Sequence, residues 1–243
     1  MEYNKPLFSV NNAKIKKGVS EGYYPIILHL SPAELAYKAL GEVGTLCECS
    51  TKECESLCLN TSGKGNFPNV QLGRLNKTIF YIEDQYEFML RLHTEIAWHV
   101  KKAEKLGLII TVRLNGTSDI KWELLYVGET GKTLFELFPD VQFYDYTKWP
   151  LDLREEIDNY HLTYSYNGKQ GSFNISMDLL ARGKNIAFVY DGQRPDHWHG
   201  FPVFDGDIND LRFTDPSGHA VALKAKGRAR GKSSKYDFVG VYE

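Results

Sequence analysis

Residues 106–119 read LGLIITVRLNGTSD, and this stretch decides the fold class. Gly107 ends a long helical pattern, the apolar residues that follow predict a buried strand, and the strand then runs into polar residues and a glycine-containing turn. A helix that leads into such a strand is typical of α/β chains, in which the carboxyl ends of parallel strands carry the functional side chains.

The same alternation extends in both directions along the chain. It predicts further strands at residues 23–30, 141–146, 160–166 and 186–190, and helices at residues 70–106, 132–138, 151–158 and 175–181. Mostly parallel strands with helical crossovers follow, either in an open sheet or in a complete or partial (β/α) barrel. We expect one barrel-like α/β domain at residues 23–227, between an N-terminal extension at 1–22 and a basic tail at 228–243.

Composition narrows the class of protein. The chain has 243 residues, of which 42% are hydrophobic, so it can bury a large core and is not wholly disordered. A net charge of -2 excludes a globally basic nucleic-acid binder. No apolar run approaches the roughly 20 residues of a membrane span, and no signal-peptide pattern is present. We therefore expect a cytoplasmic protein without a membrane partner.

The cysteines point to a ligand set. All 4 lie in the stretch LCECSTKECESLC at residues 46–58, where disulfides could close only short loops. The spacing is Cys47-x6-Cys54-x3-Cys58, and Cys54 and Cys58 share one face of a helical turn. Three thiolates could bind a [4Fe–4S] cluster with one open iron, whereas four ligands, with Cys49 or a histidine added, could hold zinc. The alternative to a metal site is that the thiols are reduced and merely lie close together, or that two of them form a regulatory pair.

Polar side chains follow two of the predicted strands. Arg113, Asn115 and Asp119 come after the first, and Asp145 and Lys148 close the next. Because a lysine and a carboxylate in one pocket can orient a substrate or exchange protons, we predict Asp119 and Lys148 as catalytic residues. Turn, capping or salt-bridge roles are the alternative. The predicted cofactor-binding residues are Arg113, Asn115, Asp145 and, from the glycine-rich continuation of the cysteine loop, Asn60.

Three weaker signals lie towards the C-terminus. Asp205, Asp207 and Asp210 resemble a calcium loop that lacks its final glutamate. His197 and His199 could ligate a metal, although a surface turn is favoured.

The third signal is a basic strip at residues 224–235. Its six cationic side chains, without an acid among them, could contact the phosphates of nucleic acid or of a nucleotide, or could have no specific partner; they are Lys224, Lys226, Arg228, Arg230, Lys232 and Lys235.

Five motifs, in order, resemble a known group of sequences. They are LCECSTKECESLCLNTSGKG, VRLNGTSDIKWE, FPDVQFYDYTK, YHLTYSYN and FPVFDGDINDLRFTDPSGHAVALKAKG. Together they resemble phage proteins related to the mycobacteriophage gene product eighty-eight family, over residues 23–227. The resemblance implies a phage origin, a location in the host cell cytoplasm and no particular activity. The family's cysteine element falls on Cys47, Cys54 and Cys58, and Cys49 departs from it.

A more distant analogy is to radical SAM (S-adenosylmethionine) enzymes, whose three-cysteine loop follows the first strand of a partial barrel. It implies that the open iron binds SAM and that the substrate is a small molecule, a nucleotide or another nucleic-acid-derived compound. The cysteine spacing differs from the main radical SAM pattern, and no clear G-G-E-type element is present. The alternative function is a non-enzymatic, zinc-stabilised protein that binds nucleic acid or a host protein.

Overall fold

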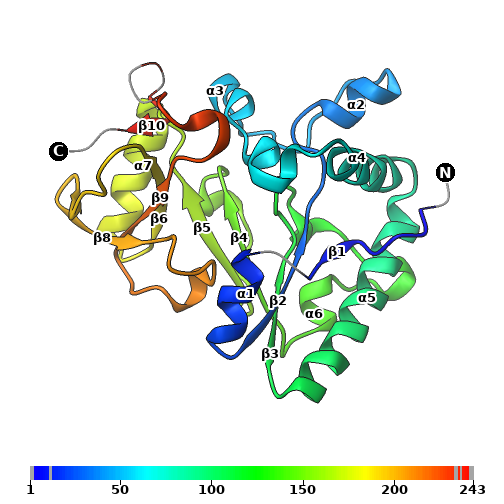
Figure 1. Cartoon of the computed structure of the whole chain (residues 1–243). Coiled ribbons are helices and arrows are strands. Elements are labelled where there is room, and N and C mark those ends of the chain that lie inside the picture. The colour runs from blue at the N-terminus through cyan, green and yellow to red at the C-terminus, as the bar shows by residue number, and fades with distance from the viewer. Residues whose placement is uncertain (1–2, 11–12, 233–234, 236, 241–243) are drawn as a thin grey trace.

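The computed structural model describes residues 3–10, 13–232, 235 and 237–240. Within them, ten strands form one sheet in the order β1-β2-β3-β4-β5-β6-β9-β8-β7, and β10 pairs with β6 (Figure 1). The strands are β1 (Phe8–Ser9), β2 (Tyr23–Leu28), β3 (Ile109–Arg113), β4 (Gln142–Thr147), β5 (Tyr160–Ser165), β6 (Ile186–Tyr190), β7 (His197–Trp198), β8 (Phe201–Asp205), β9 (Ala220–Lys224) and β10 (Val239–Gly240).

The sheet is mixed but mostly parallel. All pairings from β2 through β6 to β9 and β8 are parallel, and β1 and β7 pair antiparallel at the two ends. The predicted α/β class and parallel strands are therefore confirmed. Over the described residues the sheet stays open, so a closed barrel is not confirmed.

The helices follow the prediction less closely. They are α1 (Ala13–Ser20), α2 (Leu35–Leu40), α3 (Lys52–Ser56), α4 (Pro68–Glu83), α5 (Gln85–Leu106), α6 (Leu134–Leu137) and α7 (Gln170–Ala181). The single helix expected at residues 70–106 is two helices, because the Asp84 side chain caps α5 by accepting the Glu87 N–H at 3.1 Å. The helix expected at residues 151–158 is wrong, since only a short 3-10 turn, η5 (Leu151–Leu153), forms there.

Gly107 ends α5 as the sequence predicts. Its φ of 65° is left-handed, and the backbone N–H groups of Gly107 and Leu108 close the last helical turn on Glu104 and Ala103. Glycine adopts this conformation without the steric cost that a Cβ adds. The chain can therefore reverse and enter β3 immediately.

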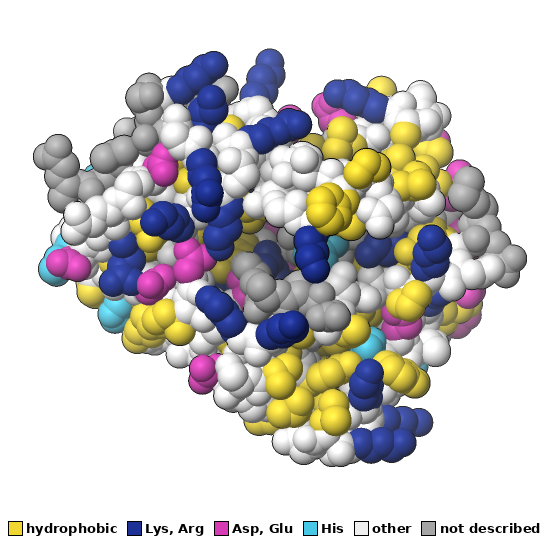
Figure 2. All heavy atoms as spheres, viewed as in Figure 1, with side chains coloured by type: hydrophobic (Ala, Val, Ile, Leu, Met, Phe, Trp, Pro, Cys, Tyr) yellow, Lys and Arg dark blue, Asp and Glu magenta, His cyan; other side chains and the backbone are white. Residues whose placement is uncertain are grey.

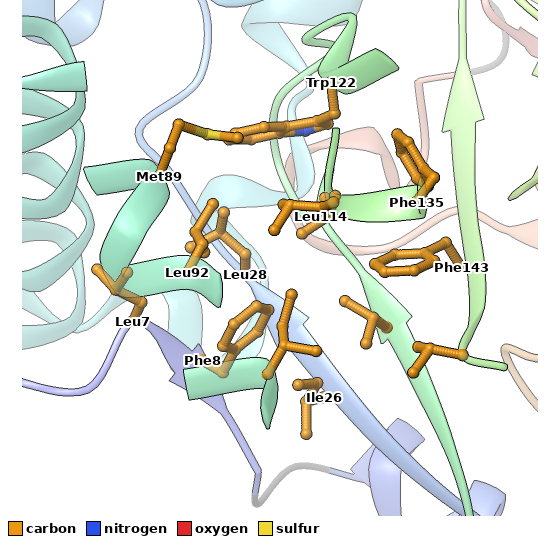
Figure 3. Close-up of a cluster of buried hydrophobic side chains, with 14 of the residues drawn as sticks. Leu7, Phe8, Ile26, Leu28, Met89, Leu92, Leu114, Trp122, Phe135 and Phe143 are labelled. Carbon is orange, nitrogen blue, oxygen red and sulfur yellow. The ribbon is translucent and has the colours of Figure 1, made fainter. Parts of the chain in front are cut away.

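Alternate residues of the strands face two different layers. Ile26, Leu114 and Phe143 point towards the helices α5 and α6, where they join the largest apolar cluster with Met89 and Trp122 (Figure 3). Leu114 follows β3 and continues its alternation. This cluster fixes β2, β3 and β4 and so positions their carboxyl ends.

The opposite face of the sheet is covered by α1 and by the 3-10 turn η6 (Arg212–Thr214). Gly18 of α1 lies so close to Pro25 that a Cβ would come within 2.4 Å of the ring. The Phe213 ring of η6 packs edge-on against Tyr23 and Tyr144, with ring centroids 5.4 and 5.6 Å apart. The sheet is therefore buried on both faces, as parallel sheets are.

Both terminal segments contribute strands to the sheet. β1 comes from the predicted N-terminal extension and pairs with β2, whereas β10 comes from the predicted basic tail and pairs with β6. Among the described helices, none combines the length and the apolar character needed to cross a membrane.

Candidate functional site

The cysteine loop lies at the carboxyl ends of the parallel strands. It follows β2 and α2 and contains α3 and the 3-10 turns η1 (Leu59–Thr61) and η2 (Gly63–Asn66) (Figure 1). Thr51 begins α3 by accepting the Cys54 N–H at 3.1 Å. All four cysteines are reduced and partly buried.

Three of the thiols influence one another electrostatically. Cys47 interacts electrostatically with both Cys54 and Cys58, and Cys54 acts on Cys58. Two of the sulfurs also accept backbone hydrogen bonds at 3.5 Å, Cys47 from the Ala33 N–H and Cys58 from the Asn60 N–H. The three residues of the predicted ligand set are thus within electrostatic range of one another, but over the described residues they are not arranged as the ligands of a metal ion.

Burial keeps these thiols protonated at neutral pH. It raises the pKa of Cys47 to about 12, with smaller opposing and reinforcing effects from the Ala33 N–H and the Asp119 carboxylate. Burial likewise raises the pKa of Cys54 and of Cys58. A metal would therefore have to displace protons from these sulfurs when it binds.

Cys49 faces a different environment. Burial raises its pKa, and the largest charge effects on it come from Asp119, Glu48, Lys121 and Arg154. The prediction that sets Cys49 apart from the ligand set stays a prediction.

Asp119 and Lys148, the predicted catalytic pair, lie next to the cysteine loop. The Asp119 N–H donates to the Leu46 carbonyl at 2.8 Å, and the Asp119 carboxylate accepts the Lys148 N–H at 2.8 Å. The Lys148 ammonium donates to the Ser165 hydroxyl at 3.0 Å, at the end of β5. The ends of β3, β4 and β5 and the cysteine loop thus meet at one place.

Asn60 lies beside Cys58, but its side chain is used within the loop. Its amide donates to Gln71 Oε1 at 2.9 Å, and its oxygen accepts from the Arg74 guanidinium. Asn60 is 2% exposed. Its backbone N–H, rather than its side chain, is the group that reaches a thiol.

Arg113 and Asp145 lie inside the protein. Arg113 forms an ion pair with Asp210 at 2.6 Å and approaches Asp145 at 3.9 Å. Asp145 accepts the Asn115 N–H at 2.7 Å and the Tyr160 hydroxyl at 2.9 Å. Burial raises the pKa of Asp145 to about 7, against the opposing charge of Arg113. Both side chains already have partners within the fold.

Asn115 organises the turn after β3. Its Oδ1 accepts from the Ser118 hydroxyl, the Ile120 N–H and the Trp122 indole at 2.9, 3.0 and 3.0 Å, and its Nδ2 donates to the Ile120 carbonyl at 2.9 Å. These contacts fit the alternative role given for Asn115 from the sequence, that of a turn-forming residue. The same turn positions Asp119.

Sequence reasoning missed a buried ion pair beneath the site. Arg154 contacts both carboxylate oxygens of Glu123, and both side chains are 1% exposed. Arg154 also lies 3.7 Å from Asp119 and 2.9 Å from the Thr147 hydroxyl. No local pattern marks this pair, because 31 positions separate its members.

The weaker candidates near the C-terminus are separated from one another or paired with cations. Asp205 pairs with Arg194 at 2.6 Å, and Asp207 pairs with Lys226. His197 is exposed in β7. Over the part of the chain that the structure describes, no three His, Cys, Asp or Glu side chains come together as the ligands of a single metal ion.

The basic strip packs against the cysteine loop. Ala225 and Ala229 share a small apolar cluster with Leu57, and Gly227 is so close to Ser62 that a Cβ would lie 3.1 Å from it. Figure 2 shows dark-blue side chains gathered over the upper left of the molecule, where the C-terminal segment and α3 lie in Figure 1. Two features distant in sequence are thus neighbours in space.

A cavity of about 390 Å³ lies elsewhere, lined by Tyr3, Glu83 and Arg91 among others. It includes none of the residues predicted for the site.

Comparison with known proteins gives one finding. The family described as gene product 88 matches residues 6–238. The chain matches no curated protein and no solved structure. The resemblance to a phage gene-product family is confirmed, and the comparisons lend no support to the analogy with radical SAM enzymes.

Proposed function

We propose that this chain, which belongs to the gene product 88 family of phage proteins, binds a [4Fe–4S] cluster through Cys47, Cys54 and Cys58. The observation that carries the proposal is the placement of three reduced thiols from one loop at the carboxyl ends of parallel strands, where they influence one another electrostatically. The reducing host cytoplasm would keep them available. Ligands of α/β proteins bind at this edge of the sheet.

The surroundings of the thiols suit such a cluster. Backbone N–H groups already point at the sulfurs of Cys47 and Cys58, and hydrogen bonds to sulfur are among the factors that set a cluster's potential. Arg74 and Lys148 both act to lower the pKa of Cys58, so cationic side chains lie close enough to balance a negatively charged thiolate cluster. The chemistry of these donors, three thiols with N–H groups and cations near them, is the support for the proposal.

Zinc is the alternative metal. Thiolates bound at about 2.3 Å to one tetrahedral ion lie roughly 3.8 Å from each other, and the described residues contain no group arranged as the ligands of a single ion. A cluster spreads its ligands over several irons and does not require them to meet at one ion. We therefore favour the iron–sulfur cluster.

The cluster would supply one-electron chemistry at the edge where β3, β4 and β5 end. There, Asp119 and Lys148 would flank a small-molecule or nucleotide substrate, and the Lys148 ammonium would attract its negative groups. If one iron is open to exchange, SAM is a candidate second cofactor. The run of parallel strands beginning at β2 would then act as a partial barrel beneath the cysteine loop.

Anaerobic purification with analysis of iron, sulfide and zinc tests the proposal. We expect a brown protein with equal iron and acid-labile sulfide, and its colour should be lost in Cys54→Ala and retained in Cys49→Ala. Stoichiometric zinc in the colourless protein, or no iron after anaerobic reconstitution, would contradict the proposal. Formation of 5′-deoxyadenosine from SAM and a reductant would test separately whether the cluster cleaves SAM to a radical.

A second candidate function is binding of nucleic acid beside the cysteine loop. The exposed side chains of Arg228, Arg230 and Lys232 form no ion pair over the described residues, and the segment that carries them packs on the loop at Ser62. We call these three side chains the basic surface. Such a surface fits the phosphates of a nucleic-acid strand.

Fluorescence anisotropy with labelled DNA, titrated at several salt concentrations, tests the second function. If the triple variant R228A/R230A/K232A loses three phosphate contacts, the slope of log K against log salt should fall by roughly 2.7 for duplex DNA and about 2.1 for a single strand. The matched control K16A/K101A/K105A removes three exposed lysines elsewhere and should keep the slope. Equal slopes in the two variants would exclude the basic surface as the contact.

A further inference from the structure

One face of the sheet buries neutral polar groups without pairing them. Five such atoms have no hydrogen-bond partner within the part of the chain that the structure describes: Thr111 Oγ1, Tyr144 Oη, Tyr146 Oη, His161 Nε2 and Thr163 Oγ1. We call these atoms the polar cluster. We propose that water molecules bind between this face of the sheet and the η6 turn and bridge the atoms of the polar cluster. This inference does not depend on the function proposed above.

The register of the strands makes these side chains neighbours. Tyr144 and Tyr146 are two residues apart on β4, so both point to the same face of the sheet. In the parallel pairing of β4 with β5, Tyr144 is aligned with His161, and Tyr146 is aligned with Thr163. Thr111 lies on β3, the next strand on the other side of β4. Because adjacent strands are only about 4.8 Å apart, the polar cluster is compact across the sheet.

The η6 turn covers the polar cluster. It contacts both β4 and β5, and its Phe213 ring packs edge-on against Tyr144 with the centroids 5.6 Å apart. Thr111, Tyr144 and Thr163 are 0% exposed, so bulk solvent does not reach them. Buried polar atoms nearly always have a hydrogen-bond partner, whether a protein group or an ordered water. Five atoms without one, on a single face, therefore indicate a bound molecule between the sheet and η6.

The charged groups around the polar cluster are already paired, which indicates a neutral occupant. Arg113, whose guanidinium lies 4.8 Å from the centre of the Tyr146 ring, forms its ion pair with Asp210 at 2.6 Å. Arg212 of η6 pairs with Asp215 at 3.3 Å, and both of these side chains are almost fully buried. An added ion would have no counter-charge in this interior, where an unpaired charge is costly.

Water is the neutral molecule that fits these atoms. Hydroxyl groups both donate and accept hydrogen bonds, as water does. Burial, with the charges of Arg212 and Lys184, lowers the pKa of His161 to about 4, so its ring is neutral at pH 7 and its Nε2 can bond to water as well. The cavities of about 390 and 330 Å³ are lined by other residues. A buried water needs far less space and makes about three hydrogen bonds, so about two waters would satisfy the five atoms.

Urea unfolding of full-length Tyr144→Phe and Tyr146→Phe tests the inference, because bound water and a dry interior predict effects of opposite sign. If water bridges the hydroxyl groups, each variant loses a hydrogen bond, and its unfolding equilibrium constant should rise about fivefold. In a dry interior the hydroxyl is a buried group without a partner, so its removal should leave stability unchanged or increase it. Tyr126→Phe is the matched control, since this side chain is 61% exposed and its hydroxyl should contribute nothing.

Oxygen-17 magnetic relaxation dispersion, which detects long-lived internal waters in solution, gives a second readout. We expect the wild type to contain at least one long-lived water more than the double variant Tyr144→Phe/Tyr146→Phe, and Tyr126→Phe to match the wild type. Equal dispersion in the wild type and the double variant would overturn the inference. So would phenylalanine variants at least as stable as the wild type, or a crystal structure with a molecule larger than water at the polar cluster.

Discussion

Replacement of Asn115 by alanine should destabilise the protein strongly. The side chain is 2% exposed and makes four hydrogen bonds within residues 115–122. Each contributes about 1 kcal/mol net, so the variant should lose about 4 kcal/mol of unfolding free energy, and more if the Trp122 indole finds no other acceptor. That is a large fraction of the roughly 5–15 kcal/mol by which a domain is stable.

Urea unfolding followed by tryptophan fluorescence measures the effect. With a slope of about 3 kcal/mol per molar urea, the midpoint should fall by somewhat more than about 1 M. Ser118→Ala is the matched control, because it removes only one of the four bonds and should cost about 1 kcal/mol. An Asn115→Ala variant no less stable than Ser118→Ala would refute the structural role. Loss of ligand binding at unchanged stability would instead favour the predicted cofactor contact.

Three further predictions concern stability. Glu123→Ala should cost about 3–5 kcal/mol, measured by urea unfolding, because it removes both carboxylate oxygens that contact the buried Arg154 and leaves only Asp119, 3.7 Å away, to balance its charge; a loss below about 1 kcal/mol would contradict this. Gly206→Ala should cost about 1–3 kcal/mol, since its Cβ would lie 2.6 Å from a valine methyl. By contrast, Gly73→Ala should stabilise α4 by about 0.5–1 kcal/mol, because its Cβ would meet no atom within 4 Å. Equal melting temperatures of Gly206→Ala and Gly73→Ala would refute both predictions. In the metal-free protein, folding raises the pKa of Cys47 from 9.0 to about 12. The free energy of unfolding is therefore undiminished by this thiol below about pH 9 and falls as the pH rises towards 12. Between pH 8 and about 10.5, wild type should therefore lose about 2 kcal/mol more than Cys47→Ala, and identical pH profiles would count against a buried thiol.

The strand predictions succeeded because buried parallel strands have a strong local signal. β2 to β6 are short apolar runs bounded by glycine or polar turns, and each formed where the pattern indicated. The helix prediction at residues 151–158 failed for the opposite reason. Its apolar spacing was short, and the Arg154 side chain is drawn into a buried ion pair with Glu123. A contact 31 residues away leaves no local pattern.

Some features of the candidate site could be predicted from local sequence, and others could not. Residue chemistry and spacing alone singled out Cys47, Cys54 and Cys58, because thiols confined to one loop are informative in any fold. The contacts of the polar residues at the strand ends depended on register. Arg113 and Asp145 are turned into internal pairs, whereas Asp119 contacts the Lys148 N–H and Arg154.

The sequence by itself determined the α/β class, the ligand-like cysteine loop and the basic strip, because each depends on residue types and periodicity over short distances. Only the tertiary structure decided that the sheet stays open, that the basic strip lies on the cysteine loop, and that Arg154 and Glu123 form a buried ion pair beneath the site. These features depend on which distant segments pack together. Packing is set by the whole core rather than by any local pattern.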